Sequence, residues 1–593
     1  MNSLGDFITD RTESLDEKGI REFFVDYRKA ELNRLLDSEQ YLLEGSRGVG
    51  KTMLMKYAAL KTEEKFEEDS VLGVWISFEE SIRLERIKIV NNDNDPFLQW
   101  TMGKILLEVL LKLKKLKPSH LDDLANSLSS IFGSTQPEDG YFKYFSILEK
   151  YIDILEKGDI VDNSELNETV STDLIRILDN PYAFKKFLLE LIEDFSISRL
   201  VLLFDEAAHV FSNEQQEKFF TFFKSLRDPK IACKASVYPG VTNYGKSFEK
   251  GQDAKEIEIS WSFSNKKDIK YIKDILKVRI QSYNKKYWEL LTVDSNIIDL
   301  ICICSNGNPR FAFHIIDALE MAHDLNESSK RIILQQLVNA VRVVIETKWK
   351  EFATLKNRLL KYSVQIDVAD KLIKQYLISN LKDWNNKRKI KESNKLSAGF
   401  YVETSLFDEL AKIFEILAYS NLVSIDHKKK SIGQGFYGFY ITFNPSLVLV
   451  DNIFQSVVNF ENVSIAIENN QAYYPTTTYM NGIVKTLKIT SEKNCSNTKC
   501  DFVTEDESFM FCPKCGNSME KDEVQDESLY KIMRSHSVDN LRLSDKIITR
   551  VKSKFNNIGE IYDAELSDIQ EISYIKEVRS AMVKTSAIEY MAG

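Results

Sequence analysis

The sequence lacks any apolar run long enough to cross a bilayer, and its first stretch, "MNSLGDFITDRTESLDEKG", is acidic and polar rather than basic and then apolar. We therefore expect a cytoplasmic protein with no membrane partner. Excess positive charge is also lacking, because the formal net charge is -10. This balance argues against a chain coated in nucleic-acid-binding surface, while local basic patches remain possible. Nothing resembles a nuclease carboxylate cluster, a protease triad or a hydrolase elbow.

Length and composition describe a soluble, multidomain globular protein. The chain has 593 residues, of which 43% are hydrophobic and 28% are charged, as is ordinary for folded soluble proteins. A chain of this length is too long to fold around one hydrophobic core, so we expect roughly two to four domains. No internal repeat, heptad run or long low-complexity linker divides it.

A glycine-rich segment, "YLLEGSRGVGKTMLMKYAAL" (41–60), matches the pattern G-x-x-x-x-G-K-[ST] without substitution. Glycines let backbone N–H groups turn toward phosphate oxygens, Lys51 adds a positive charge, and the Thr52 hydroxyl suits Mg²⁺. The flanking residues predict a buried strand before the loop and a helix after it, whose N-terminus attracts anions. We predict an ATP-binding loop, with a chance glycine-rich turn as the alternative. The predicted contacts are Gly45, Ser46, Arg47, Gly48, Val49, Gly50, Lys51, Thr52 and Met53.

A second segment, "RLVLLFDEAAHVF" (199–211), is a continuous apolar run that ends in two carboxylates. Such a run is typical of a strand inside a parallel sheet. We predict that Asp205 completes the Mg²⁺ site with Thr52, and that Glu206 orients or polarises the attacking water. The alternative is that both acids cap the following helix.

Four of the seven cysteines are clustered in "CSNTKCDFVTEDESFMFCPKCG". Two cysteine pairs around a short β-rich spacer are typical of a zinc ribbon, in which four thiolates enclose one structural Zn²⁺. The first pair is wider than the usual C-x-x-C, and disulfides are the alternative. The predicted ligands are Cys495, Cys500, Cys512 and Cys515. Cys233, Cys302 and Cys304 lie in apolar settings and are expected in the core.

The segments around the two nucleotide motifs predict a doubly wound α/β sheet. Residues 71–80 have the pattern of another central strand, and a helix and a strand, "EQQEKFFTFFKSLRD" and "IACKASVYPGVTNYG", follow the acidic pair. Between the motifs we expect a helical insertion over about residues 96–195, whose amphipathic stripes form core.

Residues from about 27 to 319 resemble the AAA+ ATPases of the origin-recognition-complex type, and most closely a bacterial and archaeal branch of that family. The resemblance is carried by "YRKAEL", "LLEGSRGVGKTMLMK", "VLLFDEA", "ASVYPGVTNYG", "EIEISWSF" and "GNPRFAFHIIDAL". It implies that Arg310 is a sensor 2 arginine in a helical lid, and that Arg227 is an arginine finger for a neighbouring subunit. The alternative for Arg310 is an ordinary arginine at the start of a helix. The alternative for Arg227 is a solvated basic helix end. Thr242 and Asn243 are the sensor 1 candidates.

The C-terminal third resembles modules appended to such ATPases. A helix, a turn and a hairpin with the basic tip Lys428, Lys429 and Lys430 resemble a winged helix, and the last residues resemble a helix-hairpin-helix domain without glycines at 573–577. Either module binds DNA or docks a protein. The expected domains are 1–263 (ATPase core), 264–363 (helical lid), 364–460 (winged-helix-like), 461–525 (β-rich with zinc ribbon) and 526–593 (small all-α).

Together these features predict an ATP-hydrolysing switch that couples nucleotide state to DNA or a partner, as a homo-oligomer or with an effector protein. The bacterial branch suggests a setting in genome maintenance or anti-phage defence. Two alternatives stay open: a signalling ATPase that recognises a protein without DNA, and a replication initiator or loader. The acidic composition favours protein recognition, whereas the lysine triplet and the cysteine cluster favour DNA.

Overall fold

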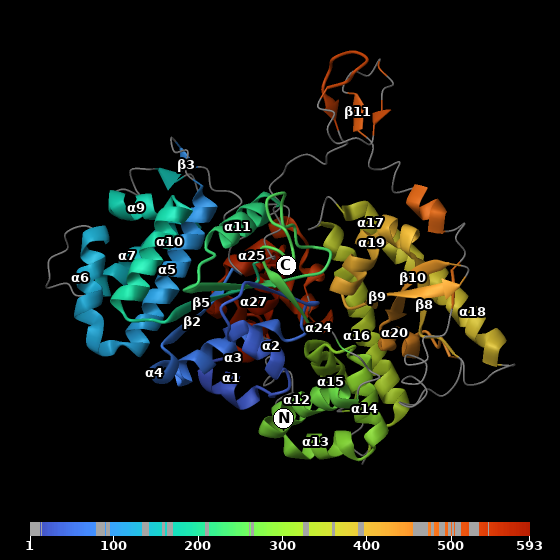
Figure 1. Ribbon diagram of the computed structural model, residues 1–593. Coiled ribbons are helices and arrows are strands. Elements are labelled where there is room, and N and C mark those ends of the chain that lie inside the picture. Colours follow the sequence, from blue (N-terminus) through green and yellow to red (C-terminus); the bar gives the residue numbers. More distant parts are fainter. Residues whose placement is uncertain are drawn as a thin grey trace. The chain divides into compact units, whose positions relative to one another are not determined.

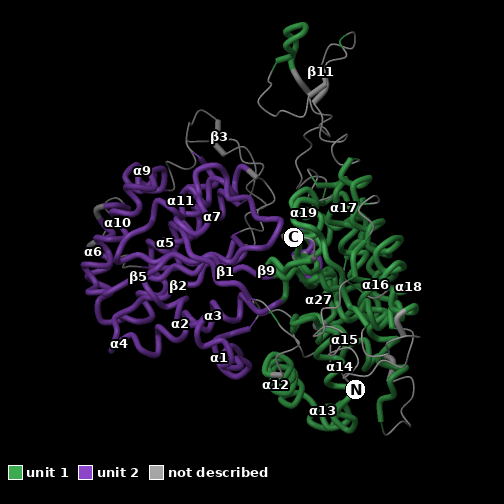
Figure 2. The backbone as a smooth tube through the Cα atoms, turned by 45° about the vertical axis from the view of Figure 1, so that its right-hand side comes forward, with its two compact units in different colours: residues 1–8, 46–48, 261–584 green, residues 9–45, 49–260, 585–593 purple. Residues whose placement is uncertain are grey.

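The protein is described by a computed structural model, which divides into two compact units (Figure 2). Unit 1 comprises residues 1–8, 46–48 and 261–584, and unit 2 comprises residues 9–45, 49–260 and 585–593. The structure describes residues 12, 15–78, 89–90, 95–132, 142–156, 161–162, 170–207, 213–259, 261, 266–323, 331–357, 362–389, 396–433, 435–454, 473–475, 480–485, 493–495, 500, 503–504, 511–520, 533–541, 543 and 545–592.

Unit 2 is built on a five-stranded parallel sheet, whose spatial order is β2-β5-β6-β1-β7. The strands are β1 (Tyr41–Glu44), β2 (Val71–Ser77), β5 (Arg199–Asp205), β6 (Ile231–Val237) and β7 (Lys255–Glu258). The apolar run in β5 suits a central position, since both faces of a parallel strand are covered. Because all strands run the same way, the loops after β1, β5 and β6 emerge at one edge of the sheet.

Alternating side chains of β5 pack into two separate hydrophobic clusters, one on each face of the sheet. Leu200, Leu202 and Phe204 pack in a cluster with the helical insertion and α11 (Asn213–Ser225). Val201 and Leu203 pack on the opposite side, in a cluster with α2 (Lys29–Leu36) and α3 (Lys51–Glu64). Helices therefore cover both faces of the sheet (Figure 1), which confirms the predicted doubly wound α/β fold.

The helices of the insertion pack against one face of the sheet and share an apolar core with it. Pro96 and Pro181 occupy the first turns of α5 and α10, where proline is tolerated, and Asp95 and Asn180 cap the exposed N–H groups. The buried Trp100 donates its indole N–H to Glu156 (2.8 Å). The helices are α5 (Pro96–Leu116), α6 (Leu121–Phe132), α7 (Phe142–Glu156), α9 (Thr172–Leu178) and α10 (Pro181–Asp194). Their apolar stripes are buried, as the sequence predicts.

Short elements complete unit 2. They are α1 (Glu17–Phe23), α4 (Phe66–Asp69), the 3₁₀ turn Pro118–His120, and the paired strands β3 (Ile89–Val90) and β4 (Val161–Asp162). Asp16 caps α1 through a 2.7 Å bond to the N–H of Gly19. Cys233 is fully buried in β6, and burial raises the pKa of its thiol to about 12, which fits the expected core role.

Unit 1 begins with a helical region. Its helices are α12 (Lys266–Tyr283), α13 (Lys285–Thr292), α14 (Ser295–Cys304), α15 (Pro309–His323), α16 (Leu334–Thr354), a 3₁₀ turn (Leu355–Asn357), α17 (Ser363–Lys371), a π-helical stretch (Leu372–Leu377) and α18 (Ile378–Lys389). Cys302 and Cys304 are buried in α14, so all three cysteines expected in the core lie there. Among the described residues of the whole chain, no helix is long and apolar enough to span a membrane.

A three-stranded antiparallel sheet follows in unit 1, in the order β8-β10-β9. Its elements are β8 (Gly399–Glu403), α19 (Thr404–Tyr419), β9 (Val423–Gly433), β10 (Phe436–Phe443) and α20 (Pro445–Val450). The predicted basic tip is wrong in one respect. Lys428, Lys429 and Lys430 lie within β9, and the hairpin turns later, next to Gly435 at φ +82°. Lys430 pairs with Gly438 of β10, while Lys428 and Lys429 lie at an irregularity in the register of β9 and β10.

The remaining elements of unit 1 are small. A second antiparallel sheet, in the order β12-β11-β13, contains β11 (Lys493–Cys495), β12 (Val503–Thr504) and β13 (Met519–Glu520). The C-terminal helices are a 3₁₀ turn (Val538–Asn540), α24 (Asp545–Val551), α25 (Ile558–Asp563), α26 (Leu566–Gln570) and α27 (Glu577–Ala592), and α27 belongs to unit 2 from residue 585 onward. In the turn before α27, Tyr574 has a φ of 68°, a conformation that usually requires glycine.

Lys234 is a buried lysine in the central strand β6, and it should make the stability of the fold depend on pH. Its fully buried side chain donates to the backbone carbonyl of Asp37 (2.9 Å) and to that of Glu39. Burial lowers the pKa of Lys234 from 10.5 to about 8. Between these values the unfolded chain holds a proton that the folded chain has released, so stability rises with pH. The full difference corresponds to about 3 kcal/mol.

We expect the thermal unfolding midpoint of the wild type to rise from pH 8 to pH 9.5 relative to that of Lys234→Met, which cannot titrate there. Lys230→Met removes a half-exposed lysine near the start of the same strand and serves as the control. Parallel pH profiles for the wild type and Lys234→Met would contradict a buried, titrating Lys234.

Candidate nucleotide site

The glycine-rich loop connects β1 to α3, as the sequence predicts. Gly48 and Gly50 adopt φ angles of 85° and 96°, and Gly50 is the residue that precedes the first turn of α3. A Cβ atom on Gly48 would lie 2.6 Å from Asn308 Oδ1, so a larger residue cannot replace it without displacing its neighbours. The loop therefore exposes backbone N–H groups at the N-terminus of a 14-residue helix, which is a favourable place for an anion.

Lys51 is held against this loop. Its side chain is buried, and Nζ donates a 2.6 Å hydrogen bond to the carbonyl of Gly45. The same ammonium lies 3.7 Å from the ring centroid of Tyr238, directly after β6. An ammonium fixed by a carbonyl and an aromatic face stays close to the loop, where a phosphate would meet it.

Asp205, the last residue of β5, is oriented by its two neighbouring strands. Its Oδ1 accepts a 2.8 Å hydrogen bond from the hydroxyl of Ser236 in β6, and its Oδ2 accepts a 3.3 Å bond from the indole N–H of Trp75 in β2. Asp205 is only 1% exposed. A carboxylate buried so deeply is stable only with such partners, and they fix its rotamer.

Glu206 begins the turn after β5 in a strained conformation. Its φ is 59°, and its backbone N–H donates to Ser236 Oγ (2.8 Å) and to Asp205 Oδ1 (3.1 Å). Left-handed backbone at a residue other than glycine is uncommon and is concentrated at functional sites. Ser236 therefore fixes both acidic residues, the first through its carboxylate and the second through its backbone.

Three residues of this site, Ser236, Trp75 and Tyr238, were not predicted from the sequence. The hydroxyl of Ser236 is fully buried in the strand "IACKASV". A polar residue within an otherwise apolar strand was the feature of the sequence that could have indicated a functional role. Trp75 and Tyr238 carry no such signal, since aromatic residues are common in strands.

The two sensor 1 candidates have local partners. The hydroxyl of Thr242 bonds to the backbone N–H and C=O of Tyr238 (2.9 Å each). The backbone N–H of Asn243 donates to Gln216 Oε1 (2.5 Å). Both residues thus stabilise the turn after β6, and their assignment as sensor 1 stays a prediction.

The two predicted arginines lie in different places. Arg227 is exposed just after α11, and its carbonyl accepts a 2.5 Å bond from Lys185 Nζ. Arg310 lies in the first turn of α15, where a Cβ atom on Gly48 would approach its own Cβ to 3.1 Å. Asn308, two residues earlier, donates to the carbonyl of Arg47 (2.6 Å). Arg310 therefore lies beside residues of the glycine-rich loop.

The donor set fits ATP and Mg²⁺. Thr52 and Asp205 supply a hydroxyl and a carboxylate, which are oxygen donors that Mg²⁺ prefers. Glycine backbone N–H groups and Lys51 suit the phosphates. Because β6 is the only strand between β1 and β5 in the sheet, the loop and the acidic pair emerge at neighbouring positions on one edge.

A candidate metal centre lies in the small sheet of unit 1. The sulfur atoms of Cys500, Cys512 and Cys515 lie within 4.8 Å of one another, and those of Cys500 and Cys512 are 3.7 Å apart. Two thiolates on one tetrahedral Zn²⁺ would be separated by about 3.8 Å, given Zn–S bonds of about 2.3 Å. Cys495 ends β11, and its side chain lies outside the described residues. The three thiols fit zinc, while the fourth predicted ligand stays a prediction.

The parallel sheet, the glycine-rich loop and the acidic pair at the end of β5 define a P-loop fold of the AAA+ class. The chain belongs to the ORC-CDC6-like family, which its sequence matches over residues 7–402. This match confirms the resemblance to ATPases of the origin-recognition-complex type. A comparison with curated proteins gives no match.

The solved structures that are similar to this chain include two proteins of Aeropyrum pernix. The Aeropyrum pernix ORC1 protein in complex with DNA shares 13% identity over 74% of this chain and 96% of that chain, with a TM-score of 0.28. The Aeropyrum pernix ORC2 protein, in ADPNP and ADP complexes, shares 14% identity over 73% of this chain and 97% of that chain, with a TM-score of 0.29. The family assignment rests on the sequence match.

Ser236→Ala tests the hydrogen bonds that orient the acidic pair. Loss of a bond to a buried carboxylate costs about 1.5–3 kcal/mol, so we expect the Mg²⁺ concentration needed for half-maximal binding of a fluorescent ATP analogue to rise at least about tenfold. Ser225→Ala, which removes a hydroxyl that donates to the carbonyl of Phe222 in α11, is the matched control. Equal Mg²⁺ dependence in both variants would refute the role given to Ser236.

Zinc content tests the metal centre. We expect about one zinc per chain in purified protein, and loss of that zinc in Cys512→Ser, since each thiolate is a ligand. Lys514→Ala alters the same turn without removing a thiolate and should keep the metal. The zinc content per chain is measured by mass spectrometry. A folded wild-type protein without zinc would contradict the proposed metal centre.

Proposed function

We propose that this protein is an ATP-hydrolysing molecular switch whose nucleotide state controls its engagement of DNA. The observation that carries the proposal is the hydrogen-bonded arrangement of Asp205, Glu206 and Ser236 at the sheet edge where the glycine-rich loop also emerges. Binding alone needs only the loop, whereas hydrolysis also needs a Mg²⁺ ligand and a group that positions water. Membership of the ORC-CDC6-like family supports ATP-dependent function in general.

Each residue of the chain has a defined task in this proposal. Loop N–H groups and Lys51 hold the phosphates, while Thr52 and Asp205 hold Mg²⁺, which neutralises developing negative charge. Glu206 accepts a hydrogen bond from the attacking water and holds it in line with the γ-phosphate. The strained backbone at Glu206 fixes the direction of its side chain, because Ser236 bonds the N–H of that residue.

The two arginines would link hydrolysis to conformation and assembly. Arg310 lies beside Gly48 and is suited to report the presence of phosphate to the helices of unit 1. Arg227 is exposed and thus accessible to a second copy of the chain, in which it would act as a finger on the γ-phosphate. ATP would then join protomers, and hydrolysis would release them.

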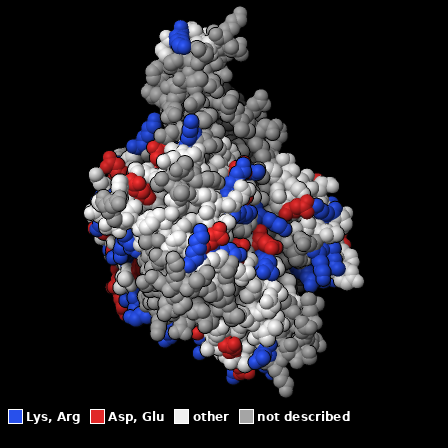
Figure 3. Space-filling view, turned by 90° about the vertical axis from the view of Figure 1, so that its right-hand side faces the viewer, with Lys and Arg blue, Asp and Glu red and all other residues white. Residues whose placement is uncertain are grey.

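Engagement of DNA is supported by local basic surface in unit 1. Lys428, Lys429 and Lys430 follow one another on β9, and the facing strand β10 exposes Phe436 and Tyr437 at its start. Cations that bind phosphates beside aromatic rings that stack on bases are a recurring combination in nucleic-acid binding. Figure 3, which views the side where α18 lies in Figure 1, shows Lys and Arg in groups with Asp and Glu among them.

The C-terminal helices offer a second candidate DNA contact. Tyr574 takes the positive φ at the position where a glycine is usual, and its ring lies 4.4 Å from the guanidinium of Arg550. Lys576 and Arg579 follow within the same turn and helix. The exposed Tyr574 ring makes docking to a protein the alternative for this turn.

The biological setting remains part of the proposal. Genome maintenance or anti-phage defence fits an ATPase whose appended modules sense DNA, and any toxic step would come from an effector protein. A replication initiator or loader is the variant in which the modules read a specific site. A signalling ATPase that recognises a protein is the variant favoured by the net charge of -10.

Glu206→Gln and Lys51→Ala separate binding from hydrolysis. We expect Glu206→Gln to bind ATP with unchanged affinity and to release phosphate at least about 100-fold more slowly, since general-base removal costs about 10²–10⁴ in rate. Lys51→Ala should lose ATP binding. Equilibrium binding of labelled ATP and steady-state phosphate release measure the two effects, and rapid hydrolysis by Glu206→Gln would move the water-positioning role elsewhere.

Replacing Lys428, Lys429 and Lys430 with glutamine tests the DNA contact. We expect weaker binding to labelled duplex DNA and a shallower dependence of affinity on salt, because fewer counterions are released. The control replaces Lys285 and Lys286, two adjacent lysines at the start of α13, with glutamine. Unchanged salt dependence in the triple variant would exclude this surface.

A further inference from the structure

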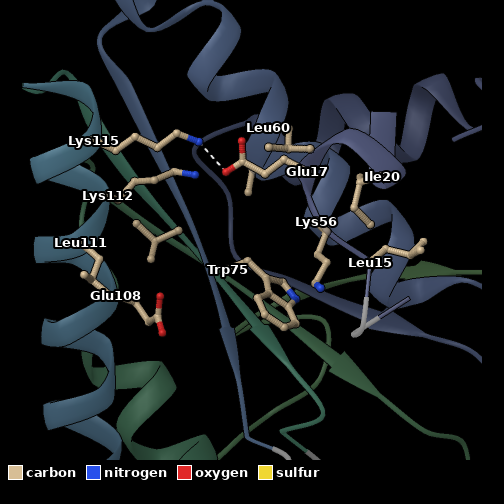
Figure 4. A pocket seen from close by; sticks show the side chains of 12 residues that line it. Leu15, Glu17, Ile20, Lys56, Leu60, Trp75, Glu108, Leu111, Lys112 and Lys115 are labelled. Atoms are coloured by element: carbon tan, nitrogen blue, oxygen red, sulfur yellow. Dashed lines mark hydrogen bonds and ion pairs between the residues drawn. The ribbon is translucent and has the colours of Figure 1, made fainter. Parts of the chain in front are cut away.

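Two polar features of the fold have no task in the proposed function. One is a cavity in unit 2 that is lined by α1, α3, α5 and β2 (Figure 4). There Lys115 reaches Glu17 and is paired, like Lys112, with Glu63, so these charges satisfy one another. The other feature is the turn 305–308 between α14 and α15 in unit 1, whose side chains bond to segments far away in the sequence.

The backbone of the turn 305–308 is tightly constrained. Asn306 and Gly307 adopt consecutive left-handed conformations, with φ angles of 52° and 72°. A Cβ atom on Gly307 would lie 2.0 Å from Cγ of Trp261, so the indole fits closely against the bare glycine. Only glycine has room at this contact. The side chains on the two sides of Gly307 are therefore held at a fixed spacing.

Asn308 joins one end of the turn to the glycine-rich loop, whose residues 46–48 belong to unit 1 like α15. Its Oδ1 accepts a bond from the N–H of Phe311 (3.1 Å), and its Nδ2 donates to the carbonyl of Arg47 (2.6 Å). Because a trans peptide unit is planar, the N–H of Gly48 points away from that carbonyl and so away from Asn308. A phosphate oxygen that accepts from this N–H polarises the same peptide, so the two hydrogen bonds strengthen each other.

Asn306 joins the other end of the turn to β9. Its Nδ2 donates to Oδ1 of Asn421 (2.8 Å) and to Oγ of Ser424 (3.0 Å). Asn421 is 3% exposed, and its own Nδ2 donates to the carbonyl of Ser305 (3.2 Å). From Ser424 the strand continues to the lysines at 428–430. A continuous series of side chains and backbone groups thus connects the loop to the strand that carries the proposed DNA contact.

The end of α14 is bonded to the same sheet module. Ser446, in the first turn of α20, is fully buried and donates to the carbonyl of Cys304 (2.8 Å). Asn444 is also fully buried and donates to the carbonyl of Asn421 (2.7 Å). The last carbonyls of a helix have no partner within the helix, so these bonds complete the end of α14. The helical region and the three-stranded sheet are therefore joined by buried hydrogen bonds.

We propose that the turn 305–308 couples the glycine-rich loop to β9, and that Asn306 and Asn421 are the positioning residues of this link. Phosphate on the loop would order the peptide between Arg47 and Gly48, and Asn308 would hold the turn against that peptide. The asparagine pair would then restrain β9. The effect on DNA affinity rests on the proposed function, whereas the link between loop and strand requires only nucleotide binding.

Hydrogen–deuterium exchange tests the link without DNA. We expect the non-hydrolysable analogue AMP-PNP with Mg²⁺ to slow amide exchange in β9 of the wild type at least about fivefold, as one net hydrogen bond predicts. Asn306→Gly removes the amide and tolerates the φ of 52°, so it should bind AMP-PNP without this slowing. Asn421→Gly should behave in the same way. Asn452→Gly makes the same change at an exposed asparagine with a φ of 52° and is the matched control.

The outcomes separate the link from the proposed function. Equal slowing of β9 in the wild type and in Asn306→Gly would overturn the link, as would binding of AMP-PNP to the wild type without any slowing of β9. Equilibrium binding of labelled nucleotide identifies the remaining case. A wild type that binds no nucleotide would overturn the proposed function and the link together.

Affinity measurements extend the test to duplex DNA. We expect AMP-PNP to raise the affinity of the wild type for labelled duplex at least about fivefold, and duplex to raise the affinity for AMP-PNP by the same factor, because coupling between two sites is reciprocal. Both factors should fall to about one in Asn306→Gly, which should bind each ligand alone as the wild type does. Full coupling in Asn306→Gly would contradict the role of the asparagine pair. A wild type that binds no DNA would contradict the proposed engagement of DNA, while exchange in β9 still decides the link.

Discussion

The buried carboxylate of Asp205 is the constraint on which the nucleotide site depends. A charge at 1% exposure needs hydrogen-bond partners, and here they come from the strands on both sides, Ser236 in β6 and Trp75 in β2. The requirement fixes the order β2-β5-β6 around the site and the turn at Glu206. A shift of either neighbouring strand by one residue would point its partner side chain to the other face.

Two local motifs made the centre of the fold predictable from sequence. The glycines at 45, 48 and 50 and the apolar run before Asp205 each specify backbone geometry over a few residues, and the structure has the strand, loop and helix where they indicate. The apolar stripes of the insertion are likewise core. These features could be predicted because burial and backbone conformation produce periodic or compositional patterns in the sequence.

Contacts between segments that are far apart in the sequence could not be predicted from such local patterns. Ser236 is 31 residues from Asp205, and Trp75 is 130 residues from it, so the pairing follows from strand order rather than from any local pattern. The lysine triplet was predicted at a hairpin tip, yet it lies within β9, where Lys430 pairs with Gly438 of β10.

In the proposed function, the chain hydrolyses ATP and DNA changes the rate of hydrolysis. The most direct measurement is phosphate release by the purified protein, alone and with duplex DNA at low and high salt, with Glu206→Gln as the blank. We expect release above the blank and stimulation by DNA that weakens as salt rises. Release no faster than that of the blank would contradict ATP hydrolysis, and release indifferent to DNA at low salt would contradict DNA as the partner.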